Sequence, residues 1–427
     1  MTNGISELAT KINVIGLGIE PGGRLNAGAE AALQSSQVMI GSERQLQWVN
    51  DMQLGVAIPS EQATLPPLKQ LPELIDGYVG EVALLASGDP LYFGIGRWLG
   101  QHYASSRLQF YPALSSVQAA CNRLGIALQD CTVISLHGRP LSSLRRHLVA
   151  GRTLIILTDQ HSHPRALADH CAAVGLAQST LWVCEQLGYP DERIQKIAVS
   201  RFDDEAVEPF SDLQVSVLQL AGAGGLIPTA PGIEDRNLVT DGEPGQGMIT
   251  KREVRLQILS LLQLGADQVL WDVGAGCGGV STETALWHAC SKVIAVEQHP
   301  GRVQCLRANR EKFGTTNLDI IEGRAPDALE GLPDPQRIFV GGNDGELEAM
   351  LALCWTRLSP GGRLVASAVT EATRSQLEQF AASDEFASVN SVQVAVSRGV
   401  LKAQQWQVED KRPVTLFSFD KPGDSDA

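Results

Sequence analysis

One stretch of this 427-residue chain, residues 268–298, constrains its fold more than any other. An apolar run leads into the glycine-rich loop GAGCGG at 274–279, which satisfies a GxGxxG pattern. A helical pattern follows the loop, and a second apolar run ends in Glu297. A strand, a glycine loop, a helix and a strand that ends in an acid form one βαβ unit of a nucleotide-binding sheet.

This βαβ unit predicts how a ligand would bind, but it does not choose the ligand. Glycines allow a tight turn and let a ligand lie against bare backbone, while the start of the helix supplies free N–H donors. Glu297 lies where a carboxylate can accept hydrogen bonds from both hydroxyls of a ribose. The pattern suits NAD as well as S-adenosylmethionine (SAM), and a purely structural glycine turn is a third interpretation.

The length and the charge of the chain bound its architecture and its partners. The length predicts two or three domains. The net charge is −14, and neither half has the basic excess expected of a nucleic-acid binder. We therefore expect no nucleic-acid partner, and we expect any anionic substrate to be held by local arginines.

The cysteines and the apolar runs indicate the cellular setting. Eight cysteines are scattered with no CxxC or CxxH pairing, which favours reduced thiols over disulfides or a zinc site. The first residues have no apolar signal core, and no stretch approaches about 18 uninterrupted apolar residues. We expect a cytoplasmic protein with no membrane segment and no bound metal.

Alternating strand and helix patterns predict an α/β fold in both halves. In the first half they predict two small α/β lobes with a junction near residue 151, the first with a mostly parallel sheet. A glycine-rich segment followed by two prolines predicts a linker. The expected domains are residues 11–221, a linker at 222–235, and residues 236–427.

Two local features of the second half predict structure more finely. Thr250, with Glu253 three residues on, has the pattern of a capping box that opens a helix. The last two alternating segments, 389–396 and 414–419, have no long helix between them. This spacing suggests an antiparallel hairpin at the edge of the sheet.

The second half resembles the class I SAM-dependent methyltransferases. The supporting features are DVGAGCG at 272–278, the acid Glu297, a fourth strand and the terminal hairpin. More narrowly, this half is similar to the decarboxylating precorrin methyltransferases. That similarity lies in the runs ITKREVR (249–255), WDVGAGCGGVS (271–281), GRAPDAL (323–329) and FVGGNDGEL (339–347).

The first half resembles the tetrapyrrole methylase family. One departure is GIEPGG at 18–23, where many members of that family carry a compact GxGPGD. The matching runs are VIGLG (14–18), IGSERQL (40–46), ASGDPLYFGIG (86–96), PALSSVQ (112–118), SLHGR (135–139) and CEQLGYPDERI (184–194).

Together the two resemblances imply a two-lobed tetrapyrrole methylase fold followed by a Rossmann-like class I SAM methyltransferase domain. The activity they imply is two methylations of a reduced tetrapyrrole at two meso carbons, with loss of carbon dioxide from an acetate side chain. They also imply one SAM per domain, a small-molecule tetrapyrrole substrate, no metal and a homo-oligomer.

Resemblance and the logic of the βαβ unit locate both ligands in the second half. Gly341, Gly342 and Asn343 follow the fourth strand at the carboxyl edge of the sheet, where we expect the floor of the substrate site. An ordinary strand-to-helix turn is the alternative. The residues expected to bind SAM are Thr250, Gly274, Ala275, Gly276, Cys277, Gly278, Glu297, Arg324 and Ala325.

Site residues in the first half are carried over from the tetrapyrrole methylase family. His137 and Arg139 follow a strand and could meet substrate carboxylates, although a lone histidine there is more often structural. Asp89 could instead cap a turn and the two serines a helix, and we interpret residues 145–146 as a solvated helix face. The expected SAM or substrate contacts are Gly16, Gly18, Gly88, Asp89, Pro90, Ser115 and Ser116.

Three other functions compete with this interpretation. An NAD-dependent oxidoreductase explains the glycine loop and Glu297, but not the terminal hairpin or the glycine loops of the first half. A non-enzymatic SAM-binding module is the second competitor, but the chain has no recognisable partner-binding segment. Methyl transfer to a different tetrapyrrole intermediate is the nearest alternative, because such substrates differ by single ring substituents.

Overall fold

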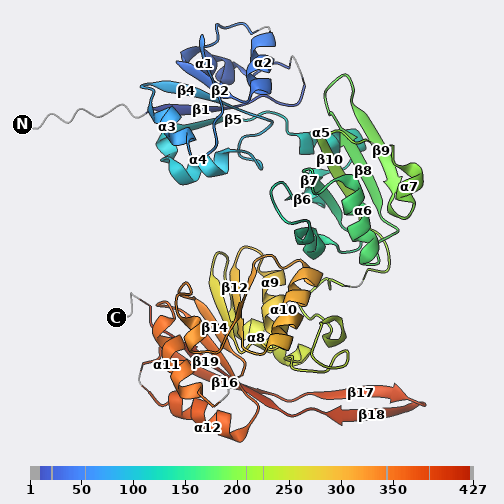
Figure 1. The fold of residues 1–427 in the computed structure, drawn as a ribbon, viewed down its shortest axis with the longest axis vertical. Coiled ribbons are helices and arrows are strands. Elements are labelled where there is room, and N and C mark those ends of the chain that lie inside the picture. The colour runs from blue at the N-terminus through green and yellow to red at the C-terminus, as the bar shows by residue number, and fades with distance from the viewer. Residues whose placement is uncertain are drawn as a thin grey trace, which may run out of the picture. The chain divides into compact units, whose positions relative to one another are not determined.

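The computed structural model of the protein divides into two compact units (Figure 1). The first comprises the residues up to Arg139 together with Ala150–Ala223, and the second comprises Pro140–Val149 with the residues from Gly224 onward. A short segment from the first half of the sequence therefore belongs to the second unit. The structure describes residues 10–20, 23–52, 54–207, 209–224, 226–342, 345–383 and 385–423.

The first lobe of the first unit is a five-stranded sheet in the order β3-β2-β4-β1-β5. All four strand pairings are parallel, as the sequence predicts for this lobe. Its edge strand β3, Glu61–Thr64, is short and largely exposed, and it carries no apolar run that would announce it. The other elements are β1 Lys11–Gly16, α1 Ala27–Ser35, β2 Val38–Gly41, α2 Glu43–Asp51, α3 Leu71–Asp76, β4 Glu81–Ala86, α4 Gly96–His102 and β5 Leu108–Tyr111.

The second lobe is a mixed sheet in the order β6-β7-β10-β8-β9. Only β6 and β7 pair in parallel, and the other three pairings are antiparallel. The sheet begins with β6, before residue 151, where the sequence places the junction between lobes. Its elements are α5 Ser116–Leu124, β6 Cys131–Ser135, β7 Thr153–Leu157, α6 Pro164–Ala173, β8 Thr180–Glu185, β9 Arg193–Ala198, α7 Phe202–Glu205 and β10 Gln214–Gln219.

The second unit is built on a seven-stranded sheet in the order β13-β12-β11-β14-β15-β19-β16. The first five strands run parallel, and β19 pairs antiparallel with both β15 and β16. The strands are β11 Val269–Val273, β12 Lys292–Glu297, β13 Leu318–Glu322, β14 Arg337–Val340, β15 Arg363–Ala368, β16 Ser388–Val394 and β19 Val414–Asp420. The helices are α8 Arg252–Leu262, α9 Gly279–Trp287, α10 Pro300–Phe313, α11 Leu347–Arg357 and α12 Glu371–Phe380.

The predicted edge hairpin is confirmed by the pairing of β16 with β19. Between these two strands the chain leaves the sheet as a long two-stranded ribbon, formed by β17 (Ser397–Lys402) and β18 (Gln405–Asp410) (Figure 1). The sequence did not predict this ribbon, because its residues are exposed on both faces and follow no buried alternation. Within the described residues, no helix has the length and apolarity that crossing a membrane requires.

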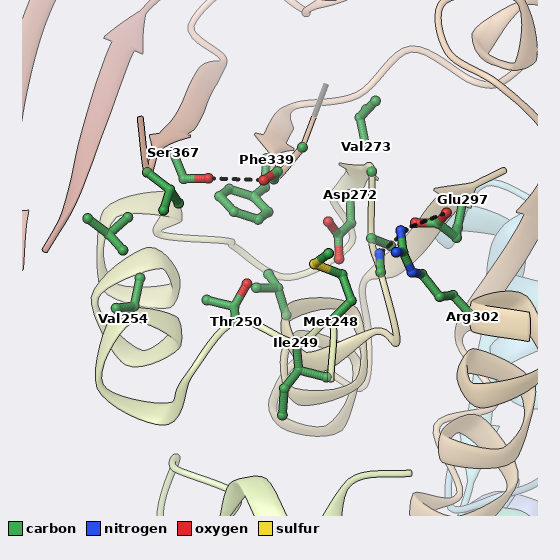
Figure 2. Close-up of a pocket in the computed structure, with 18 of the residues that line it drawn as sticks. Met248, Ile249, Thr250, Val254, Asp272, Val273, Glu297, Arg302, Phe339 and Ser367 are labelled. Atoms are coloured by element: carbon green, nitrogen blue, oxygen red, sulfur yellow. Dashed lines mark hydrogen bonds and ion pairs between the residues drawn. The ribbon is translucent and has the colours of Figure 1, made fainter. Parts of the chain in front are cut away.

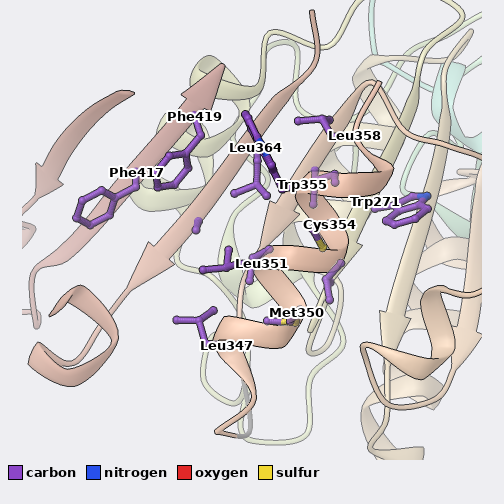
Figure 3. Close-up of a cluster of buried hydrophobic side chains, with 14 of the residues drawn as sticks. Trp271, Leu347, Met350, Leu351, Cys354, Trp355, Leu358, Leu364, Phe417 and Phe419 are labelled. Atoms are coloured by element: carbon purple, nitrogen blue, oxygen red, sulfur yellow. The ribbon is translucent and has the colours of Figure 1, made fainter. Parts of the chain in front are cut away.

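Side chains alternate between the two faces of the C-terminal sheet, as the pleat requires. Trp271 and Val273 of β11 pack into a buried cluster with α11 and α12 (Figure 3), whereas Leu270 packs with α8 and α9 on the opposite face. Asp272 shares the face of Leu270, and Ser281 of α9 donates a hydrogen bond to its carboxylate. The pleat therefore places one acid among apolar residues, two positions before the glycine loop.

The segment Pro140–Val149 contains residues 145–146, which do not form the solvated helix face that the sequence predicted. Its 3₁₀ turn, Leu141–His147, packs against α10, and its guanidinium groups bind carbonyl oxygens at helix ends. Arg146 donates to the carbonyls of Ala285 and Leu286 at 2.6 and 2.8 Å, and burial lowers its pKa. Cations at these positions satisfy carbonyls that have no partner within the helix.

Candidate functional site

A cavity of about 390 Å³ opens at the carboxyl edge of the C-terminal sheet. It is lined by residues that directly follow β11, β12, β13 and β14, which is where ligands bind in doubly wound sheets. Figure 2 shows Thr250, Asp272 and Phe339 around this space, with Glu297 and Arg302 to one side. The predicted residues that line it are Thr250, Gly274, Ala275, Gly276, Glu297, Arg324, Ala325, Gly341 and Gly342.

The glycine loop is held between two other stretches of backbone. Gly274 and Gly276 have φ angles of +72° and +60°, which side chains of L-residues rarely adopt. A Cβ atom on Gly274 would lie 2.7 Å from the carbonyl oxygen of Gly342, and one on Gly276 would lie 2.5 Å from that of Met248. These glycines are therefore required both by conformation and by the close approach of the neighbouring chain.

Glu297 is preorganised by the backbone around it. Its carboxylate is 5% exposed, and its two oxygens accept the N–H groups of Gly276 and His299, each at 2.8 Å. Arg302 lies 4.0 Å away. Because a carboxylate oxygen offers two lone pairs, each oxygen keeps one acceptor site for a hydroxyl in the cavity.

Asp272 is the most unusual acid of the cavity. Its side chain is fully buried, one oxygen accepts from Ser281, and the other has no partner among the described residues. Burial is the main cause that raises its pKa to about 7, and the charge of Glu297 adds to the effect. A buried acceptor without a partner at the cavity wall suits a cationic donor, such as the amino group of SAM.

A buried arginine fixes the segment that covers the glycine loop. Arg255 of α8 is 0% exposed, and it donates to Glu283 of α9 at 2.5 Å and to Asp235 at 3.2 Å. It also donates to the carbonyl of Thr250 at 2.7 Å. Since removing one partner would leave an uncompensated buried charge, this network holds the segment before α8 in place.

The predicted capping box at Thr250 is wrong. The helix begins at Arg252 with Lys251 as its N-cap, and no side chain of the cap accepts a hydrogen bond. Asp235 instead accepts the N–H of Arg252 at 3.0 Å. A distant acid therefore supplies the cap, which leaves Thr250 free to line the cavity.

Gly342 and Gly341 differ in how much room their backbone leaves. A Cβ on Gly341 would lie 3.0 Å from the ring of Phe339, whereas among the described residues one on Gly342 would have only the Gly274 carbonyl within 4 Å, at 3.9 Å. A side chain at position 342 would therefore enter free space at the cavity wall. Asn343, the third residue of the predicted floor, lies outside the described residues.

Two of the predicted SAM residues, Cys277 and Gly278, do not line the cavity. Cys277 is buried, and its thiol contacts the carboxylate of Asp241 at 3.5 Å. Burial raises the pKa of this thiol to about 12, so it stays protonated and unreactive. Gly278 serves packing, because a Cβ there would lie 2.2 Å from Leu306.

The first unit carries its own cavity, of about 370 Å³. The predicted residues Gly18, Gly88, Ser115 and Ser116 line it. Its aromatic lining was not predicted from the sequence, because single aromatic residues far apart in the chain carry no local signal. These aromatic residues are Trp48, Tyr92, Phe93 and Tyr189.

The remaining predicted residues of the first unit lie outside this cavity's lining. Asp89 accepts the N–H of Leu91 at 2.9 Å, as in a capped turn. Gly16 allows close packing, since a Cβ there would lie 2.0 Å from the carbonyl oxygen of Gly88. Pro90 is buried, and His137 and Arg139 are exposed.

The serines of the first cavity have a structural role as well. Ser115 is the N-cap of α5, and it forms a complete capping box with Gln118. Both Ser115 and Ser116 nevertheless line the cavity, so the cap and the predicted contact coincide in one turn. Among the described residues, no group of three or more His, Cys, Asp and Glu side chains could hold a metal ion.

The sequence missed several cavity residues of the second unit. Most of them come from segments far from the glycine loop, including the base of the ribbon. Lys251 and Phe339 stand in runs that carry the family resemblance, but no local pattern marked either as a site residue. The sequence offered one hint of them, which is that basic residues lie near the ends of the two alternating segments, 389–396 and 414–419. The missed residues are Met248, Lys251, Arg302, Phe339, Ser367, Arg398, Lys411 and Arg412.

Comparison with known proteins assigns the two halves of the chain. Residues 11–202 match the family model of tetrapyrrole (corrin/porphyrin) methylases, and residues 244–421 match that of the precorrin methyltransferase domain. A protein of Sinorhizobium, precorrin-6Y C(5,15)-methyltransferase [decarboxylating], is 37% identical over 84% of this chain and 84% of its own length. This chain belongs to the precorrin-6Y C(5,15)-methyltransferase (decarboxylating) family.

Other members of the precorrin-6Y methyltransferase family agree with this assignment. The enzyme of the same name from Mycobacterium tuberculosis is 32% identical over 84% of this chain and 87% of its own length. Cobalt-precorrin-6B C(15)-methyltransferase (decarboxylating) of Salmonella typhimurium is 42% identical over 27% of this chain and 60% of its own length. Members of the family are SAM-dependent enzymes, so the oxidoreductase alternative is not favoured.

The raised pKa of Asp272 predicts a pH dependence of stability. Its folded-state pKa lies above the unfolded value, so its stabilising contribution is complete below about pH 4 and is lost as the pH rises through 7. Relative to Asp272→Asn, the wild type should lose on the order of 3 kcal/mol of unfolding free energy between about pH 5 and pH 8. Urea unfolding without SAM measures this loss, and parallel profiles for the two proteins would contradict it.

Proposed function

We propose that this enzyme converts precorrin-6B (precorrin-6Y) to precorrin-8X in cobalamin biosynthesis. It would methylate C5 and C15 with two molecules of SAM and remove carbon dioxide from the acetate of ring C, releasing S-adenosylhomocysteine. The observation that carries the proposal is that each unit, matched by a different methylase family, has a cavity at its glycine loop. The free cysteines of the structure fit the cytoplasm as its location.

In the second unit the proposed roles follow from the cavity. Glu297 would accept from the ribose hydroxyls, and Asp272 would accept from the amino group of SAM. Gly341 and Gly342 would let the flat macrocycle lie close to the backbone. SAM supplies an electrophilic methyl group, and the protein holds the reacting carbon at attack distance while excluding water.

Decarboxylation requires an electron sink and a proton. The carbon–carbon bond to the carboxylate breaks, carbon dioxide leaves, and the electron pair moves into the conjugated macrocycle. A proton then adds to the former methylene carbon, which becomes a methyl group. The protein's contribution would be to hold the macrocycle in an orientation that aligns the breaking bond with the ring system.

The product mass tests the reaction, and Gly342→Leu tests where the second unit binds its substrate. Wild-type enzyme should give a product that has gained two methyl groups and lost carbon dioxide.

Because position 342 faces open space, Gly342→Leu should fold and bind SAM with nearly unchanged affinity, yet lose decarboxylation with its coupled methylation. Mass spectrometry and calorimetry measure these two properties, with Gly342→Ala as the control. Equal loss of SAM binding and catalysis would refute the proposed floor.

We also propose that each unit binds one SAM. Calorimetric titration should then give two sites per chain. Glu297→Ala should abolish only the site of the second unit, because both oxygens that would meet the ribose are lost. One site in the wild type, or two in the variant, would contradict this stoichiometry.

We propose further that the enzyme forms a homo-oligomer through the β17–β18 ribbon. Four large apolar side chains there are exposed in the single chain, a pattern typical of association surfaces. Trp406→Ser should shift the protein toward monomer in sedimentation velocity, whereas Val79→Ser, at another exposed apolar residue, should not. An unchanged oligomer, or a monomeric wild type, would refute the proposal. The side chains are Val400 (52% exposed), Leu401 (58%), Trp406 (71%) and Val408 (65%).

A further inference from the structure

The cavity of the second unit is lined by more cations than anions, although the chain as a whole is acidic. A positive lining on a negative protein attracts anions locally without a global field. The acids among the lining residues are Glu253, Asp272, Glu297 and Glu346. The cations are Lys251, Arg302, Arg324, Arg398, Lys411 and Arg412.

Three of these cations are already engaged by carboxylates. Arg302 pairs with Asp241 at 3.1 Å, and Arg324 pairs with Glu346 at 3.2 Å. Arg398 binds two acids, one of them Glu253 at 2.7 Å, and these bonds raise its pKa. Such arginines help to shape the cavity, but their charge is largely compensated.

The other three cations keep donors free. The Lys251 ammonium donates to the carbonyl of Gly245 at 2.8 Å and has no ion pair among the described residues. Arg412 forms neither a hydrogen bond nor an ion pair within the described part of the chain. Of the acids in the described residues, Lys411 pairs only with Glu409, whose side chain is 73% exposed, so water weakens that bond.

These three side chains line one cavity, and the charge of Lys411 acts on the Lys251 ammonium. Lys251 precedes α8, while Lys411 and Arg412 follow β18 where the ribbon returns to the sheet. The backbone N–H of Lys411 donates to the carbonyl of Val396 at 2.8 Å, which closes the base of the ribbon. Burial lowers the pKa of Lys251, and the nearby charge of Lys411 lowers it further. An anion placed among these groups would relieve both effects.

We propose that Lys251, Lys411 and Arg412 bind peripheral carboxylates of the tetrapyrrole, as a carboxylate-binding rim of the second cavity. This inference rests on the proposed function, because an enzyme that removes carbon dioxide must bind a carboxylate-bearing substrate. Apolar residues beside the rim, Val396 and Val414, line the same cavity and suit the flat ring. The chain thus presents apolar surface and cations side by side.

The rim binds the carboxylates that remain on the product. A cation that held the departing carboxylate would stabilise the ground state more than the transition state, since the charge leaves that group as the bond breaks. Carboxylates at other positions keep their charge throughout the reaction. Binding them fixes the orientation of the macrocycle without raising the barrier.

Lys251→Gln and Arg412→Gln test the rim. Each variant removes one cation, and glutamine at position 251 can still donate to Gly245. The dissociation constant of precorrin-6Y, measured by absorbance titration without SAM, should rise about tenfold in each variant. KM should rise in parallel while the SAM dissociation constant stays within about twofold. Raising the ionic strength should weaken substrate binding in the wild type more than in the double variant.

Lys69→Gln is the control, because Lys69 is an exposed lysine that lies outside the ribbon and does not line the cavity. It should leave all three constants unchanged. If the wild type is active and both rim variants bind the substrate as the wild type does, the proposed rim is refuted and the proposed function stands. SAM affinity that falls as much as substrate affinity would also overturn it. A wild type that neither methylates nor decarboxylates the tetrapyrrole would instead refute the proposed function.

Discussion

The C-terminal site depends on a charge that has been taken out of water. Arg255 has no exposed surface, so its guanidinium must find acceptors inside the protein, and it finds them on three separate segments: Glu283 on α9, Asp235 before the site, and the carbonyl of Thr250. This requirement ties the chain that precedes the sheet to the helix that follows the glycine loop. The same tie brings the Met248 carbonyl over the loop, where it accepts the N–H of Cys277 at 2.9 Å.

The pleat and the glycine loop then determine what the cavity offers a ligand. The pleat turns Asp272 toward the loop and away from water, which raises its pKa, while Glu297, at the end of the next strand, is held by two backbone N–H groups. Asp272 therefore has a pKa of about 7, and the Glu297 carboxylate is fixed in position. Both lie at one edge of the sheet, because parallel strands end there together.

Features encoded by short patterns could be predicted from the sequence, and features that depend on distant partners could not. The apolar run at 269–271 and the glycines after it predicted the βαβ unit, and most of the residues predicted there to bind SAM line the cavity. The cap at Thr250 failed because Asp235, 17 residues earlier in the chain than Arg252, supplies the acceptor instead. Lys411 and Arg412 were missed because nothing near them resembles a site, and it is the return of the ribbon to the sheet that brings them to the cavity.

The path of residues 140–149 has a consequence for how the two halves of the chain can be separated. Val149 packs in one cluster with Leu286 and Phe313, and Arg146 satisfies the last carbonyls of α9. Cleavage at the glycine-rich linker would therefore release a C-terminal polypeptide with bare apolar surface and unsatisfied helix ends. The linker in the sequence and the division between the folded units do not coincide. A stable C-terminal half on its own would need another segment in place of residues 140–149.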